Sequence, residues 1–214
     1  MLQDIIIVGF GGHGKSVADT IERIGKYQII GYTDVKAVHS CKYDYLGTDD
    51  VLLREKDRYI GAQLAMGLGY MGHGDIRQRL FHQLTFAGYE FPVIIDPSSI
   101  VSREASIGQG SFVGKGAIVN AEARIGEMCI INSGVIVEHE CCIGDGTHLA
   151  VGSTVCGQVY VAKLSLIGAN TTVTQGVKIG THSIIGAGAV VTEDIGDEVV
   201  AVGIPAKVIK TNEG

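Results

Sequence analysis

Hydrophobic and polar positions follow one rhythm before about residue 97 and another after it. In the first part, short apolar runs bounded by glycine alternate with segments whose apolar residues recur every three or four positions. Such runs are typical of buried strands, and such segments are typical of helices. We predict strands at 4–9, 28–32, 63–66 and 91–95, and helices at 15–24, 48–56 and 75–87. This alternation predicts a small parallel sheet covered by helices.

The second rhythm has a period of six. Every sixth residue from Val101 to Val191 is Val, Ile or Leu, in sixteen consecutive positions, and the residue two before each is small or β-branched. Strand side chains alternate, so both positions point into a narrow core. Gly follows the aliphatic residue in seven of the sixteen hexads, and we expect Gly and Asn to relieve the backbone at bends. A parallel β-helix with three short strands per coil fits this period. We therefore predict two domains, 1–96 and 97–214.

A glycine motif follows the first predicted strand. Gly9, Gly11 and Gly14 fit G-x-G-x-x-G between a strand and a helix, and Asp34 lies at the end of the second strand. Backbone N–H groups at a helix N-terminus bind anions, and an acid at the position of Asp34 would meet a ribose hydroxyl. The motif indicates a Rossmann-like, nucleotide-binding βαβ domain. An NAD oxidoreductase is a rival, although the sheet is half the usual size. Alternatively, the glycines serve only a tight turn and close packing.

Composition and charge narrow the class of protein. The chain of 214 residues is 46% hydrophobic and 19% charged, which is globular composition. Its net charge of -6 and lack of a basic run argue against a nucleic-acid partner. No apolar run is long enough for a membrane span, and the N-terminus lacks a signal-peptide pattern. Five cysteines without CxxC spacing favour a reducing cytoplasm, and Cys129 and Cys141 fall at the small inward position of the repeat.

The repeat resembles the hexapeptide-repeat acyltransferases, which have a left-handed parallel β-helix. Together with the glycine motif, it makes the chain similar to the PglD/NeuD-like family of sugar O-/N-acyltransferases. The resemblance implies a left-handed β-helix, acetyl-CoA as cosubstrate, and a homotrimer with active sites between subunits. It also implies substrate contacts in the N-terminal domain, at the following residues: Gly11, Gly12, His13, Asp34 and Gly69. Where the family often has two adjacent acids, this chain has Asp34 followed by Val35.

His139 is the candidate catalytic base. It comes two residues after the inward Val137, so it lies at a corner or on an outward face, and Glu140 follows it. Acetyl transfer to an amine needs a group that accepts the proton of the nucleophile, and imidazole suits this near neutral pH. A neighbouring carboxylate would select the right tautomer and stabilise the imidazolium.

Residues 132–161 match the catalytic segment of the family. The resemblance implies that His139 is the general base, that Glu140 raises its basicity and that His148 contacts acetyl-CoA. It further implies that the pantetheine arm of the cosubstrate is bordered by three residues: Gly157, Ala169 and Ala187.

The sequence thus predicts a cytoplasmic N-acetyltransferase acting on the 4-amino group of a nucleotide-linked 4-amino-4,6-dideoxy sugar. UDP is the favoured nucleotide, with dTDP and GDP left open. One alternative is O-acetylation of a sialic acid-type sugar, and another is a non-enzymatic, nucleotide-binding trimeric scaffold. A trimeric zinc enzyme is a third, but His139 and His148 are nine residues apart and no Cys/His pair has metal-ligand spacing, so no metal is expected.

Overall fold

The computed structural model describes residues 2–39, 41–72 and 75–212. The chain divides into two compact units. The first consists of Met1–Gly69 with Asp75–Pro97, and the second consists of Tyr70–Gly74 with Ser98–Gly214. The main division falls one residue after the boundary proposed from the sequence. Nothing in the sequence pattern indicated that Tyr70–Gly74 would group with the second unit.

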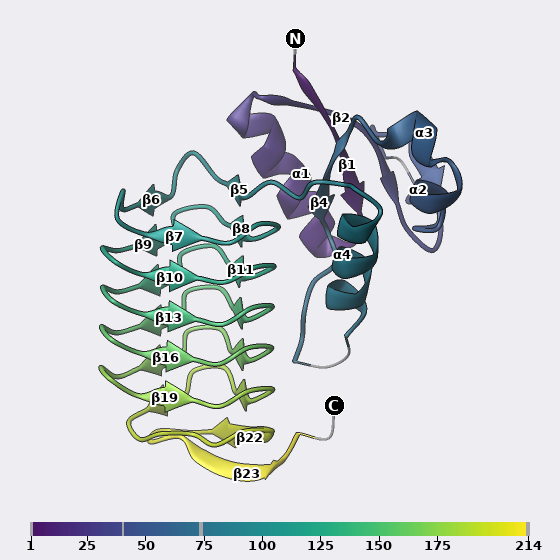
Figure 1. The fold of residues 1–214 in the computed structure, drawn as a ribbon. Coiled ribbons are helices and arrows are strands. Elements are labelled where there is room, and N and C mark those ends of the chain that lie inside the picture. Colours follow the sequence, from purple (N-terminus) through teal and green to yellow (C-terminus); the bar gives the residue numbers. More distant parts are fainter. Residues whose placement is uncertain (1, 40, 73–74, 213–214) are drawn as a thin grey trace. The chain divides into compact units, whose positions relative to one another are not determined.

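The first unit is built on a four-stranded parallel sheet (Figure 1). Its strands, in spatial order, are β3 (Tyr45–Gly47), β2 (Tyr27–Thr33), β1 (Gln3–Val8) and β4 (Gln63–Met66). Its helices are α1 (Gly12–Ile24), α2 (Val51–Arg54), α3 (Lys56–Tyr59) and α4 (Ile76–Phe86). Ile5, Ile6 and Ile7 on the central strand β1 are fully buried, as expected of a parallel sheet covered on both faces.

Two elements of this unit differ from the sequence-based prediction. The strand predicted at 91–95 is confirmed only for Ile94–Ile95 (β5), and its predicted place in this sheet is wrong, because the fourth strand of the sheet is β3. Pro92 has no N–H to donate to a neighbouring strand, while β3 is too short and too exposed to show an apolar run. The helix predicted at 48–56 is in fact the pair α2 and α3, because the backbone leaves helical geometry at Glu55.

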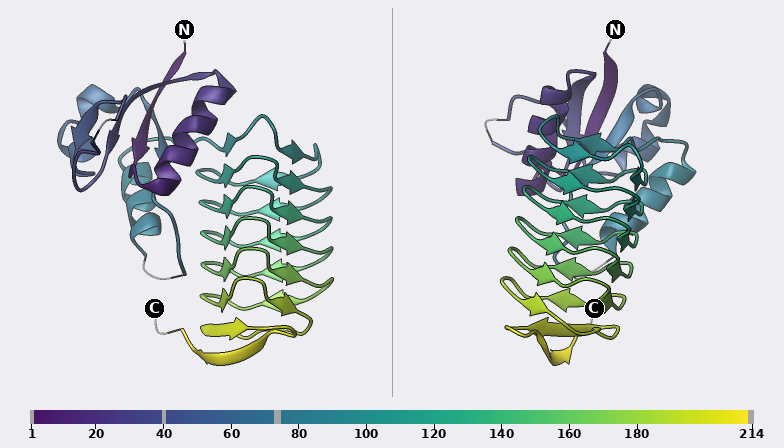
Figure 2. Two further views of the ribbon diagram at one scale, coloured as in Figure 1. Left: turned by 180° about the vertical axis from the view of Figure 1, so that it is seen from behind. Right: turned by 90° about the vertical axis from the view of Figure 1, so that its left-hand side faces the viewer.

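The second unit is a stack of coils whose strands form three sheets (Figures 1 and 2). The β6 sheet contains β6 (Ile100–Val101), β9 (Ile118–Val119), β12 (Ile136–Val137), β15 (Thr154–Val155), β18 (Thr172–Val173) and β21 (Val190–Val191). The β7 sheet contains β7 (Ser106–Ile107), β10 (Arg124–Ile125), β13 (Cys142–Ile143), β16 (Tyr160–Val161) and β19 (Lys178–Ile179).

The β8 sheet contains β8 (Phe112–Val113), β11 (Ile130–Ile131), β14 (His148–Leu149), β17 (Leu166–Ile167), β20 (Ile184–Ile185), β22 (Val199–Val202) and β23 (Lys207–Thr211). Strands β22 and β23 pair antiparallel, whereas the coils pair parallel at a separation of eighteen residues. This arrangement is consistent with the left-handed β-helix of the resemblance.

The inward positions predicted from the hexads are confirmed in fourteen of the sixteen, while Val101 and Ile107 in the first two are only half-buried. The fourteen aliphatic residues from Val113 to Val191 are at most 4% exposed, and the small residues two before them, Ser111 to Ala189, are at most 5% exposed. Several polar members of the second set donate to carbonyl groups one coil further on. Ser111 Oγ donates to the Gly126 carbonyl at 2.8 Å, and Ser165 Oγ to the Gly180 carbonyl at 2.8 Å. A buried hydroxyl therefore costs little here.

Glycine has two separate roles in this repeat. The bends have a left-handed backbone at every sixth residue from Gly110 to Gly188, with φ of 53–75°, and only seven of these fourteen residues are glycine. The seven glycines that directly follow the aliphatic positions do not form this series. A Cβ on any of them would come within 2.2–2.9 Å of the next coil. These glycines therefore permit close stacking of coils, while residues such as Glu140 adopt the bend conformation themselves.

Candidate active site

His139 and Glu140 form the bend that follows β12. Glu140 has a φ of 58°, and its carboxylate Oε2 lies 3.0 Å from His139 Nδ1. Both side chains are about half exposed, at 49% and 48%. With Nδ1–H donating to the carboxylate, the lone pair of the imidazole is on Nε2, at the opposite side of the ring. The two predicted catalytic residues thus form the hydrogen-bonded pair that a general base requires.

The next coil supports this pair. Gln158 Nε2 donates to Glu140 Oε2 at 3.1 Å, and the Gln158 N–H donates to the His139 carbonyl at 2.9 Å. A Cβ on Gly157 would lie 2.6 Å from His139 Nε2 and Cε1, so the imidazole packs directly over this glycine. Sequence reasoning named Gly157 for another reason and missed Gln158. The available signal was its position eighteen residues after Glu140, at the same bend one coil further on.

His148 lies in a different environment. It is on β14, in the β8 sheet, and is only 8% exposed. Its Nδ1 is 2.6 Å from the Tyr70 carbonyl oxygen, and its Nε2 is 3.1 Å from Asn132 Nδ2. Both ring nitrogens therefore have protein partners, and His148 is not part of the hydrogen-bonded group around His139.

The residues assigned to the pantetheine arm occupy two bends. Gly157 lies with His139 at the bend after the β6 sheet. Ala169 and Ala187 lie at the bend after the β8 sheet, where the Gly188 N–H donates to the Ala169 carbonyl at 2.8 Å. These two bends flank the β6 sheet, so one chain does not bring the three residues into one patch.

The glycine motif joins β1 to α1. Gly9 has a φ of 86°, and a Cβ on Gly14 would lie 2.4 Å from the Gly9 carbonyl oxygen, so these two serve the turn and the close packing. Gly11 and Gly12 differ, because a Cβ on either would meet nothing within 4 Å. Gly11 is the N-cap of α1, and no side chain caps the helix there. The N-terminus of α1 therefore presents backbone to open space, as an anion site requires.

Asp34 and Gly69 lie at the ends of the strands beside this loop. Asp34 Oδ2 accepts the Phe10 N–H and Oδ1 accepts the Val35 N–H, each at 2.7 Å. Asp34 thus holds the loop in place, and its remaining lone pairs can still accept a hydroxyl. A Cβ on Gly69 would lie 3.7 Å from the His13 Cβ. The end of β4 is therefore next to the start of α1, and the predicted substrate residues share this edge of the sheet.

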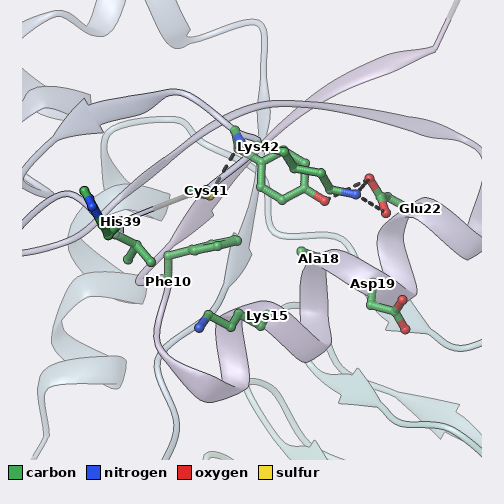
Figure 3. Close-up of a pocket in the computed structure, with 10 residues that line it drawn as sticks. Phe10, Lys15, Ala18, Asp19, Glu22, His39, Cys41 and Lys42 are labelled. Atoms are coloured by element: carbon green, nitrogen blue, oxygen red, sulfur yellow. Dashed lines mark hydrogen bonds and ion pairs between the residues drawn. The ribbon is translucent and has the colours of Figure 1, made fainter.

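A cavity of about 270 Å³ lies beside Phe10 (Figure 3). The Phe10 ring packs on Tyr32 at 4.6 Å and meets the edge of Tyr43 at 5.5 Å between centroids. In Figure 3, Glu22 and Lys42 meet at one end of the cavity, 2.6 Å apart. The Lys42 hydrogen bond lowers the pKa of Glu22, and burial raises the pKa of Tyr43 to about 12. Sequence analysis did not identify this cavity.

Other candidate chemistry finds less support. Cys129 and Cys141 are buried, as predicted, and burial raises the pKa of Cys141 to about 11, so its thiol stays protonated near neutral pH. Within the described parts of the chain, no three His, Cys, Asp or Glu side chains gather as metal ligands would. None of the helices described is long and apolar enough to cross a membrane.

Two family models match the chain. The PglD N-terminal domain matches residues 4–84, and the bacterial transferase hexapeptide matches residues 159–193. PerB from Caulobacter crescentus, solved with CoA and GDP-perosamine, is 32% identical, with 98% of each chain covered and a TM-score of 0.88. The acetyltransferase domain of PglB from Neisseria gonorrhoeae, solved with acetyl coenzyme A, is 29% identical, with 98% of this chain and 100% of that one covered and a TM-score of 0.89.

A curated relative matches over a shorter stretch. UDP-N-acetylbacillosamine N-acetyltransferase from Bacillus subtilis is 35% identical over 114 residues, which is 52% of this chain and 51% of that protein. The match thus spans about half the length of this relative.

The stacked hexapeptide coils, with a histidine–carboxylate pair at one bend, define a hexapeptide-repeat acyltransferase. More narrowly, the chain belongs to the family of acetyl-CoA-dependent sugar N-acetyltransferases that carry a PglD N-terminal domain. The family expected from the sequence is confirmed.

Proposed function

We propose that this protein transfers the acetyl group of acetyl-CoA to the 4-amino group of a UDP-linked 4-amino-4,6-dideoxy sugar. The observation that carries the proposal is the His139–Glu140 pair, with Nδ1 bound to the carboxylate and the ring held over Gly157. This arrangement leaves Nε2 with a lone pair for the proton of an attacking amine.

The reaction needs one base and no covalent intermediate on the protein. The amine nitrogen attacks the thioester carbon while His139 Nε2 accepts a proton from that nitrogen. Glu140 stabilises the imidazolium through Nδ1–H. The tetrahedral intermediate then collapses, the C–S bond breaks, and the leaving CoA sulfur takes the proton from His139. The products are the N-acetylated sugar and CoA, and His139 returns to its neutral form.

The first unit binds the nucleotide in this proposal. The diphosphate lies at the N-terminus of α1, against the backbone of Gly11, Gly12 and His13, and the ribose lies near Asp34. The base occupies the cavity beside Phe10, whose ring offers a stacking surface. The relatives are named for sugars of different nucleotides, UDP and GDP. The choice of UDP therefore rests on the experiment below.

We also propose that the protein is a homotrimer whose active sites lie between subunits. The outward side chains of the β6 sheet are all β-branched and uncharged: Ile100, Ile118, Ile136, Thr154, Thr172 and Val190. Ile100 is 66% exposed, and the others are half-buried. Such a face favours burial against another chain. Acetyl-CoA would then lie between the Gly157 bend of one copy and the Ala169–Ala187 bend of another. Each bend offers the pantetheine arm backbone groups and little side-chain bulk.

The test is CoA release from acetyl-CoA, followed with Ellman's reagent, over a panel of acceptors. The panel contains UDP-, dTDP- and GDP-linked 4-amino sugars and free sialic acid. We expect rapid release with the UDP sugar. Because the protein has half-buried thiols of its own, each reaction needs a blank without acceptor. Release with sialic acid alone would identify an O-acetyltransferase, and no release with any acceptor would contradict the proposal.

His139→Ala tests the role of the base in the same assay. We expect turnover to fall by about 10²- to 10⁴-fold, the usual contribution of a general base, with UDP binding unchanged. His82→Ala replaces an exposed histidine on α4 and is the matched control. Full activity of His139→Ala would remove His139 from the mechanism.

A further inference from the structure

Gln158 contacts both members of the His139–Glu140 pair. It lies on the coil that follows them, eighteen residues after Glu140 and at the same bend. Its side-chain Nε2 donates to Glu140 Oε2 at 3.1 Å, and its backbone N–H donates to the His139 carbonyl at 2.9 Å. One residue therefore holds the histidine through the main chain and the carboxylate through the side chain.

The amide of Gln158 and the imidazole of His139 share one acceptor atom. Glu140 Oε2 lies 3.0 Å from His139 Nδ1 and 3.1 Å from Gln158 Nε2. A carboxylate oxygen has more than one lone pair and can accept both bonds at once. In the part of the chain that the structure describes, no lysine or arginine lies within salt-bridge distance of Glu140. The direction of the carboxylate is therefore set by these two donors.

Of the two neighbouring coils, only the following one supplies a donor at this bend. The corresponding residue on the preceding coil is Glu122, which has the same left-handed backbone, with a φ of 60°. A carboxylate accepts hydrogen bonds and donates none, and a second negative charge repels that of Glu140. The side-chain support of Glu140 therefore comes from Gln158.

Gln158 keeps a side chain at a position that favours glycine. Its φ is 62°, and the next residue in the series at this bend is Gly176, with a φ of 75°. A side chain in the left-handed region costs free energy that glycine avoids. The bend thus forms without the Gln158 side chain, and a substitution can separate the role of this side chain from folding.

We propose that Gln158 is a positioning residue that holds the Glu140 carboxylate against Nδ1 of His139. The carboxylate then keeps the proton of the neutral imidazole on Nδ1 and the lone pair on Nε2. Without the amide, Glu140 is free to rotate into solvent, because its side chain is 48% exposed. The proton then moves to Nε2, the nitrogen that carries it in most free neutral histidine. The inference rests on the proposed function for its kinetic consequence only.

Two substitutions remove the amide in different ways. Gln158→Gly relieves the bend and keeps the backbone bond to His139, so we expect a thermal midpoint equal to or above that of the wild type. Gln158→Glu keeps the length of the side chain but places a second carboxylate beside Glu140. For both we expect kcat to fall about tenfold, as for the loss of one hydrogen bond to a charged group, with the KM of both substrates unchanged.

Gln109 provides a matched control. Its Nε2 donates to Glu127 Oε1 at 3.1 Å, which is also a bond between a glutamine and a glutamate eighteen residues apart. This pair lies at the bend between β7 and β8, whereas His139 lies at the bend after β12. Gln109→Glu changes the surface without touching the candidate base, so kcat should stay within about twofold of the wild type.

The tautomer of His139 gives a readout that does not depend on activity. Nitrogen-15 NMR of histidine-labelled protein distinguishes a protonated ring nitrogen from an unprotonated one, and His139→Ala identifies the signals of His139. At alkaline pH, where the ring is neutral, we expect the proton on Nδ1 in the wild type and in Gln109→Glu. In Gln158→Gly and Gln158→Glu we expect a mixture in which Nε2 carries part of the proton.

The two readouts keep the positioning role and the proposed function apart. A wild-type tautomer in both Gln158 variants would overturn the positioning role, whatever their kcat. A rise in the KM for acetyl-CoA with an unchanged kcat would also overturn it, in favour of a cosubstrate contact. If the wild type releases no CoA with any acceptor, the proposed function fails, while the NMR spectra still decide whether Gln158 fixes the tautomer.

Discussion

At the scale of the residue, the orientation of the His139 ring depends on the absence of a side chain in the next coil. Gly157 has no side chain, and the imidazole occupies the space that a Cβ would fill. Gln158 holds Glu140 from the same coil at 3.1 Å. The imidazole is thus held by a carboxylate on one side and by a bare backbone beneath it. Because the ring is half exposed, a new methyl group would displace the ring rather than the backbone.

Gly157→Ala should therefore lower kcat without unfolding the protein. A Cβ would lie 2.6 Å from the ring, and a shift of the base by about 1 Å can cost about 10²-fold in rate. The measurements are steady-state CoA release and the thermal midpoint. Gly196→Ala is the matched control in the same unit, because a Cβ there meets nothing within 4 Å. A variant with wild-type kcat would show that the ring position seen here is not the catalytic one.

At the scale of the element, the start of α1 combines two kinds of glycine. Gly14 lies against the Gly9 carbonyl and allows β1 and α1 to pack closely together. Gly12 is the first residue of α1, and a Cβ there would meet nothing within 4 Å. Close packing therefore accounts for Gly9 and Gly14, whereas no such packing surrounds Gly11 and Gly12. An open helix N-terminus of this kind favours the proposed anion site.

Alanine at the two positions should have opposite effects. Gly14→Ala places a Cβ 2.4 Å from a backbone oxygen and should cost about 1–3 kcal/mol of stability, measured by urea unfolding. Gly12→Ala should leave stability unchanged or slightly higher but weaken UDP binding, measured by calorimetry, because its methyl group occupies the space of the phosphate. Equal destabilisation by both, or wild-type UDP affinity in Gly12→Ala, would contradict this division.

At the scale of the whole molecule, two outward faces of the β-helix differ in chemistry. The β6 sheet presents uncharged β-branched side chains, while the β7 sheet presents polar and charged ones such as Arg124 and Lys178. The bends that border the β6 sheet carry His139 on one side and Ala187 on the other. A chain with its candidate residues on two separate bends is suited to share a site with a second copy.

Ile136→Lys should therefore dissociate the protein and lower its activity. A lysine on β12 would bury an unpaired charge in the proposed interface. Sedimentation velocity should show three times the chain mass of 22.6 kDa for the wild type and a single chain for the variant. Tyr160→Lys, on the outward face of β16 and 48% exposed, is the control and should stay trimeric. A monomeric wild type, or a trimeric Ile136→Lys, would contradict the shared site.

The sequence by itself determined the β-helix and the pairing of His139 with Glu140. The hexads repeat one local rule sixteen times, so each coil specifies its own inward residues without reference to distant parts. His139 and Glu140 are neighbours in the chain, so their pairing needs only the bend that the repeat supplies. The order β1, α1, β2 was predictable for the same reason, since apolar runs and helical spacing are local patterns.

Only the tertiary structure decided the partners of His148, the support from Gln158 and the strand that completes the first sheet. His148 meets Tyr70 across 78 residues of sequence, and no periodicity connects them. Residues 91–95 are more apolar than Tyr45–Gly47, yet β3 pairs with β2, because pairing depends on where the chain returns rather than on hydrophobicity. Contacts between residues far apart in the sequence leave no local pattern, and these contacts shape the surroundings of the candidate site.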